Sequence, residues 1–114
     1  MKQNLRTYNE IEKKIGVGFT DKRLLKIAFT HRSYLNENRG QGLKNNERLE
    51  FLGDAVLELI ISSFLFTNYP DKVEGDLTSI RAAVVRTESL AEESRKLDIG
   101  QYLKMSKGEE DSGG

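Results

Sequence analysis

Apolar residues in this chain recur at intervals of three and four, and no segment alternates apolar and polar residues for long. This period is typical of amphipathic helices, because residues three and four apart share one face of an α-helix. The single proline, Pro70, and the clustered glycines leave long uninterrupted segments between them. The pattern therefore predicts an all-α fold.

The apolar period and its flanking residues predict five helices and a short final turn, over about residues 5–15, 21–29, 46–68, 76–86, 87–97 and 100–103. Thr20 is the expected cap of the second helix, because a hydroxyl can accept a hydrogen bond from the first turn. Residues 36–46 are expected to form a polar loop. The predicted domain covers residues 1–105, and residues 106–114, which offer nothing to bury, are expected to be a flexible tail.

The length and composition narrow the class of protein. A chain of 114 residues is long enough for one domain. The absence of cysteine excludes disulfides, thiol nucleophiles and thiolate-bound metals, and a single histidine excludes a zinc site built from several histidines. No apolar stretch of the sequence is long enough to span a bilayer, and no signal peptide is visible. These features predict a soluble, cytoplasmic protein with no membrane partner.

The charges are distributed unevenly although the formal net charge is zero. Residues 1–46 contain ten Lys or Arg and four Asp or Glu, whereas residues 47–114 contain eight and fourteen. A basic surface beside an acidic site would suit a polyanion that is reached through metal ions. Surface charge also fluctuates along ordinary chains, so the charge pattern alone leaves both interpretations open.

Four carboxylates lie on one side of the longest predicted helix. At 100° per residue, Glu47, Glu50, Asp54 and Glu58 fall within an arc of about 80°. The other sides of this helix are apolar, so we expect it in the centre of the domain, where ionised carboxylates would need a cation such as Mg²⁺. The alternative is a solvated acidic stripe whose first members favour the helix dipole. The spacing alone does not decide between the two.

The residues themselves carry a more specific signal. Residues 46–57 read NERLEFLGDAVL, which closely resembles the signature of the ribonuclease III family of double-stranded-RNA endonucleases. Residues 30–34 (THRSY) and the stretch from 74 to 85 are similar to family segments on either side of that signature, and residues 107–114 are similar to the linker before a second catalytic segment. The resemblance covers essentially the whole chain. It implies a ribonuclease III-type helical endonuclease domain that is truncated before its last helices.

The resemblance assigns roles to particular residues. Glu50 and Asp54 match the first two metal-binding and catalytic carboxylates of the family. Glu47 and Glu74 match outer acidic residues that line the RNA-binding cleft, and Phe51 matches an aromatic that enters a pocket of the partner subunit. Favourable helix starts would account for Glu47 and Glu74 without function, and ordinary core packing would account for Phe51.

Basic residues near the signature are candidates for RNA contacts. Duplex RNA is recognised through its shape, phosphates and 2′-hydroxyls, which a basic rim can contact without reading bases. Arg48, Arg32, Arg39 and Lys44 are the candidates, although scattered basic residues usually serve solubility. We expect His31 to cap or pack a helix rather than act as a general base.

The resemblance implies a homodimer that hydrolyses duplex RNA with Mg²⁺, or with Mn²⁺ in its place, and needs no small-molecule cofactor. The products would carry 5′-phosphate and 3′-hydroxyl ends, in the processing of ribosomal or other RNA. The family's further Asp and Glu would follow Gly114, so half of the ligand set lies outside this sequence and the activity of the chain by itself is open. The alternatives are a non-catalytic dimeric module that binds duplex RNA and a helical protein-interaction domain.

Overall fold

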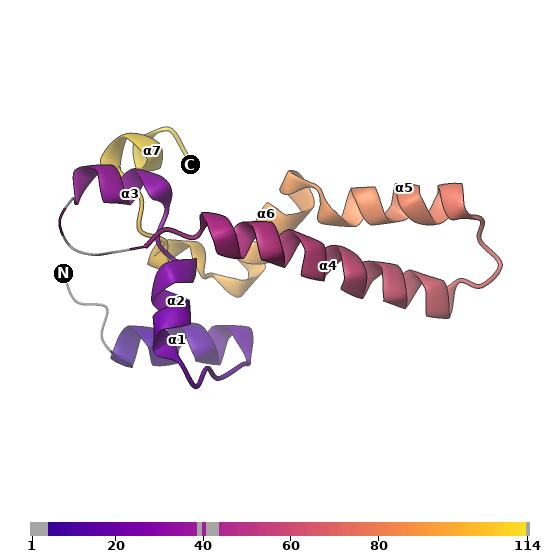
Figure 1. Ribbon diagram of the computed structural model, residues 1–114, viewed down its shortest axis with the longest axis horizontal. Helices are drawn as coiled ribbons and strands as arrows, with labels where there is room; N and C mark the ends of the chain where they lie inside the picture. The colour runs from indigo at the N-terminus through magenta and orange to yellow at the C-terminus, as the bar shows by residue number, and fades with distance from the viewer. Residues whose placement is uncertain (1–4, 39, 41–43, 114) are drawn as a thin grey trace. The chain divides into compact units, whose positions relative to one another are not determined.

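The computed structural model describes residues 5–38, 40 and 44–113 (Figure 1). Over these residues the secondary structure is helical, apart from an isolated parallel bridge between Thr30 and Lys104. The elements are α1 (Leu5–Ile15), α2 (Lys22–Ala28), α3 (Arg32–Glu37), α4 (Glu47–Asn68), α5 (Glu74–Val85), α6 (Thr87–Leu97), a 3₁₀ turn (Gly100–Tyr102) and α7 (Lys107–Asp111). The predicted all-α fold is confirmed.

The chain divides into two compact units. The first contains Met1–Glu50 and Leu97–Gly114, and the second contains Phe51–Lys96. The short helix α7 belongs to the first unit. None of the described helices combines the length and the apolar composition needed to cross a bilayer.

The second helix begins one residue later than the sequence suggested. Asp21, rather than Thr20, is the cap of α2: its backbone is extended, and its Oδ1 accepts a hydrogen bond of 3.0 Å from the Arg23 N–H. Aspartate and threonine both serve as caps, and the residue that directly precedes α2 is Asp21. The prediction for Thr20 is wrong by one position.

A short helix, α3, occupies the start of the expected polar loop. His31 is its cap, because its backbone is extended and its Nδ1 accepts a hydrogen bond of 3.1 Å from the Ser33 N–H. This confirms the capping role expected for His31. Six residues make fewer than two turns, so no apolar period could reveal α3 in the sequence.

Another short helix, α7, lies in the expected flexible tail. The Ser106 Oγ accepts a hydrogen bond of 3.1 Å from the Glu109 N–H, while the Ser106 N–H donates to the Ser33 Oγ at 2.8 Å. The Lys107 N–H donates to a Glu37 carboxylate oxygen at 3.2 Å, so α7 is bonded to α3 (Figure 1). The spacing Ser-x-x-Glu at 106–109 is typical of a helix start.

The first unit has a small apolar core. Tyr8, Ile11 and Leu25 are its buried residues, and Ile11 has no exposed surface. Four partly buried residues pack against this cluster: Ile15, Phe19, Phe29 and Tyr102. The side chains of α1, α2 and the 3₁₀ turn therefore meet in one apolar core, which stabilises the fold of the first unit.

The second unit leaves most of α4 uncovered. Leu65 is the buried residue of this helix, and Arg81 of α5 donates to the Ser62 Oγ at 2.8 Å across the hairpin (Figure 1). Large apolar side chains of α4 are exposed, including Phe51, Leu52, Val56, Leu59, Ile60, Phe64 and Phe66. The expectation that this helix lies covered in the centre of a domain is therefore wrong for the described chain. A helix that is apolar on several sides needs neighbours on each of them, and the second unit contains only α5 and most of α6 beside it.

One carboxylate joins the loop between α1 and α2 to the core. The Glu12 carboxylate accepts hydrogen bonds from the Lys22 ammonium and from the Phe19 N–H. The bond from Lys22, followed by the bond from Phe19, holds the pKa of the Glu12 carboxyl below its ordinary value. The ionised form of Glu12 therefore stabilises the folded first unit.

The first prediction compares two isoleucines of opposite exposure. Ile11 is fully buried, so Ile11→Ala should lower the free energy of unfolding by about 2–5 kcal/mol. Ile60 is 58% exposed, so Ile60→Ala should change it by about 0.5 kcal/mol or less. Urea unfolding of the 114-residue chain measures both. An equal loss at the two positions would contradict the exposed placement of Ile60.

The second prediction concerns acid stability. Because the folded-state pKa of Glu12 is lowered, its contribution is complete above the ordinary value of 4.5 and is lost as the pH falls through the lowered pKa. Glu12→Gln should therefore be less stable than the wild type at pH 7, and the difference should shrink in acid. Thermal melts from pH 7 to pH 3 measure this, with Glu58→Gln as the control. A difference that does not vary with pH would exclude this role for Glu12.

Candidate functional site

The start of α4 is fixed by two neighbouring asparagines. The Asn45 Oδ1 accepts a hydrogen bond of 3.0 Å from the Glu47 N–H. The Asn46 N–H donates to the Thr30 carbonyl at 2.9 Å, and the Asn46 Nδ2 donates to the Ala28 carbonyl, also at 2.9 Å. These bonds attach the first turn of α4 to the segment that leaves α2.

The same segment is bonded along its other edge. The Lys104 N–H donates to the Phe29 carbonyl at 2.8 Å, and the His31 N–H donates to the Lys104 carbonyl at 2.7 Å. Between them Thr30 is 1% exposed, and its hydroxyl donates to the Lys26 carbonyl at 2.6 Å. We call residues 28–31 the junction segment. It connects three parts of the chain that are far apart in sequence.

Glu50 and Asp54 lie on successive turns of α4, as their spacing predicts. Both side chains are exposed, and neither carboxylate forms a hydrogen bond or an ion pair with any residue that the structure describes. The argument that buried acids require a compensating cation therefore does not apply, because water can solvate them both. What the structure offers is two carboxylates with no competing partner among the described residues.

Glu47 differs from the other acids of this helix. Its Oε1 lies 3.1 Å from the Nη1 of Arg32, and both side chains are largely exposed. Exposed ion pairs of this kind contribute about 0–1 kcal/mol, so the pair is readily broken. Arg32, a candidate for RNA contact, is therefore the partner of a predicted cleft residue. No local sequence pattern predicts this pairing, because the two residues lie on different helices.

Glu74 is the first residue of α5 and is exposed. Because α4 and α5 form a hairpin, Glu74 lies near the end of α4, whereas Asp54 lies near its beginning (Figure 1). Asn68 follows Asp54 by 14 positions, which corresponds to ~21 Å along the helix. A single chain therefore does not bring Glu74 to Asp54.

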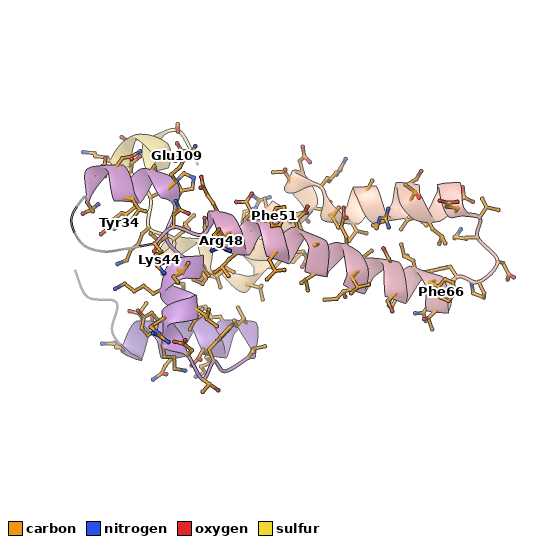
Figure 2. All side chains as sticks on the ribbon, in the orientation of Figure 1. Tyr34, Lys44, Arg48, Phe51, Phe66 and Glu109 are labelled. Atoms are coloured by element: carbon orange, nitrogen blue, oxygen red, sulfur yellow. The ribbon has the colours of Figure 1, made fainter. Side chains whose placement is uncertain are left out.

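The remaining candidates are on the surface. Arg48 and Lys44 are exposed and form no ion pair with a described residue (Figure 2). Arg39 lies outside the described residues. Phe51 is 83% exposed, directly after Glu50, and Figure 2 shows Phe51 and Phe66 at the two ends of α4.

The donor atoms of Glu50 and Asp54 fit a hard divalent cation. Mg²⁺ is usually held by one or two carboxylates, with waters and substrate phosphates completing its coordination. Within residues 5–38, 40 and 44–113, no group of three or more His, Asp or Glu side chains could hold a metal ion. The described chain can therefore contribute a pair of carboxylates and no larger cluster.

Solved structures with the same arrangement are nuclease domains. The nuclease domain of ribonuclease III from Campylobacter jejuni matches 98% of this chain with a TM-score of 0.80 and 39% identity, and the match covers 70% of that domain. A second structure of that domain, which concerns structural flexibility in a region involved in dimer formation, matches 91% of this chain with a TM-score of 0.80 and 41% identity, and the match covers 68% of it. The fold is that of a helical nuclease domain.

Sequence comparisons identify the family. The family model described as Ribonuclease-III-like matches residues 21–114. Ribonuclease 3 of Streptococcus agalactiae is 55% identical over 106 residues, which cover 93% of this chain and 46% of that protein. Ribonuclease 3 of Listeria welshimeri is 50% identical over 107 residues, which cover 94% and 47%. The chain belongs to the ribonuclease III family, and it spans about half the length of these relatives.

Proposed function

We propose that this chain is part of a Mg²⁺-dependent endonuclease that cleaves double-stranded RNA as a homodimer. Membership of the ribonuclease III family supports the class of reaction. The observation that carries the assignment of the site is the pair of exposed carboxylates, Glu50 and Asp54, on successive turns of α4 within the signature residues 46–57. We expect the protein to act in the cytoplasm, in the processing of ribosomal or other RNA.

The proposed reaction is hydrolysis of one phosphodiester in each strand. Water attacks the phosphorus, the bond to the 3′ oxygen breaks, and the leaving oxygen takes a proton. One water is consumed per cut, and the products carry 5′-phosphate and 3′-hydroxyl ends. When bound, Mg²⁺ or Mn²⁺ would stabilise the charge that develops on the phosphate oxygens and lower the pKa of water.

The chain's own residues would hold the metal and the substrate. Glu50 and Asp54 would supply carboxylate oxygens to the cation, because a hard cation such as Mg²⁺ favours oxygen ligands. Arg48, exposed in the first turn of α4, would contact RNA phosphates, and Glu47 would release Arg32 for the same role when their weak surface pair breaks. Glu74 would line the same cleft from a second copy of the chain, because its own copy places it far from Asp54.

The third prediction tests the two carboxylates. In the full-length protein, Glu50→Gln and Asp54→Asn should each reduce Mg²⁺-dependent cleavage of duplex RNA at least 100-fold, which corresponds to about 2.7 kcal/mol in the activation barrier. The matched control is Glu58→Gln, one turn further along the same exposed helix, which should cleave within about twofold of the wild type. Single-turnover cleavage of a labelled RNA duplex measures all three.

Retention of near wild-type cleavage by both Glu50→Gln and Asp54→Asn would exclude this site. Loss of cleavage in the Glu58 variant to the same degree would mean that the acidic face acts through its total charge. If the wild-type protein binds duplex RNA without cutting it at any Mg²⁺ concentration, the non-catalytic RNA-binding module is the correct alternative.

The fourth prediction concerns the homodimer. Phe51 is an exposed aromatic at the start of an uncovered apolar helix, and buried aromatics dominate protein interfaces. Phe51→Ala should weaken dimerisation by about 2 kcal/mol, or ~30-fold in the dissociation constant. Phe66→Ala, at the other end of α4 and 78% exposed, is the control and should leave the dimer intact. Sedimentation equilibrium measures both, and equal weakening by the two variants would remove the special role of Phe51.

A further inference from the structure

The side chains of two adjacent asparagines at the start of α4 form different kinds of hydrogen bond. Asn45 forms a local turn just before the helix, because its side-chain oxygen accepts from the N–H of Glu47, the first residue of α4. The side chain of Asn46 turns away from the helix and donates to the Ala28 carbonyl, 18 residues earlier in the chain. A carbonyl can only accept, so this contact requires the NH₂ group of Asn46. The amide of Asn46 is therefore used to join two elements and not to cap one.

Asn46 is attached to the junction segment at two points. Its backbone N–H donates to the Thr30 carbonyl, and its side chain donates to the Ala28 carbonyl, both at 2.9 Å. The segment itself is firmly placed, because Thr30 is buried and Lys104 bonds to the other edge. One bond would fix the position of the helix start and leave its rotation free. Two bonds to a rigid segment restrict the rotation as well.

The position of Asn46 affects that of Glu50, because the two residues are joined by a backbone hydrogen bond. The Asn46 carbonyl accepts a hydrogen bond of 2.8 Å from the Glu50 N–H, which begins the hydrogen-bonded ladder of α4. Asn46 and Glu50 also belong to the same compact unit. The direction in which Glu50 leaves the helix is therefore determined by where Asn46 is held.

We propose that Asn46 is a positioning residue for Glu50: through its two bonds to the junction segment, it sets the rotation of the first turn of α4 that presents the Glu50 carboxylate to the divalent cation and the RNA. This inference rests on the proposed function. Asn46 touches neither the metal nor the substrate, and acts only through the placement of Glu50.

The chain provides a matched control for a merely stabilising role. Asn68 lies at the other end of α4, and its Nδ2 donates to the Phe64 carbonyl at 2.8 Å. As in Asn46, the donor is an asparagine side-chain amide and the acceptor is a backbone carbonyl. The acceptor of Asn68, however, is in its own helix, so this bond connects α4 to no other element. Asn68→Ala removes an equivalent hydrogen bond without freeing the start of α4.

The fifth prediction is measured in the full-length protein with Asn46→Ala, Asn46→Asp and Asn68→Ala. Removal of a group that orients a metal ligand typically costs about 10- to 100-fold in metal affinity or activity. Both Asn46 variants should therefore lower kcat, or raise the Mg²⁺ concentration for half-maximal cleavage, by ~10- to 100-fold, while KM for the RNA changes by about twofold or less. Asn68→Ala should match the wild type in each quantity.

A second readout does not depend on cleavage. Mn²⁺ alone is titrated into each protein, and the free ion is measured by electron paramagnetic resonance. Both Asn46 variants should bind Mn²⁺ more weakly than the wild type by about the same 10- to 100-fold, whereas Asn68→Ala should not. Asn46→Asp keeps the size of the side chain, and its charge favours a helix start, so this variant remains folded even if Asn46→Ala does not.

Several results would overturn the inference. Wild-type kcat, Mg²⁺ dependence and Mn²⁺ affinity in folded Asn46→Asp would exclude a positioning role, and so would an equal loss in Asn68→Ala. Glu50→Gln, assayed beside them, separates this failure from failure of the proposed function. If Glu50→Gln is inactive and the Asn46 variants are normal, only the role of Asn46 is wrong. If Glu50→Gln cleaves normally, the proposed site is wrong, and the role of Asn46 fails with it.

Discussion

The hydrogen bonds of the junction segment are the interaction on which the first unit depends. Residues 28–31 bond to Asn46 along one edge and to Lys104 along the other. They therefore bring the start of α4 and the segment before α7 to the same place, although 58 residues separate Asn46 from Lys104 in the chain. Backbone groups make most of these bonds, so the arrangement depends little on the identity of the side chains other than Asn46.

The second constraint is that α4 carries both acidic residues and exposed apolar residues. One side of this helix carries acids, of which Glu50 and Asp54 have no partner among the described residues, and other sides carry apolar residues that the described chain does not cover. An exposed apolar surface of this extent is typical of protein interfaces. It is consistent with the proposed homodimer, in which a second copy would cover the apolar surface around Phe51.

Much of the fold could be predicted because its signals are local. The apolar period located α1, α4 and α6 to within a residue or two, and the motif in residues 46–57 identified the family. The short helices α3 and α7 were missed because five or six residues are too few for a period to appear. Their starts were nevertheless encoded: Ser106 and Glu109 have the spacing of a capping pair, and His31 was expected to cap.

The sequence by itself determined which of the longer segments are helical and that Glu50 and Asp54 lie one turn apart, because helix geometry depends only on neighbouring residues. Only the tertiary structure decided that the sides of α4 are exposed, that Arg32 pairs with Glu47, and that Glu74 lies far from Asp54. These facts depend on contacts between residues distant in the chain. No local pattern encodes such contacts, since they arise only when whole elements pack together.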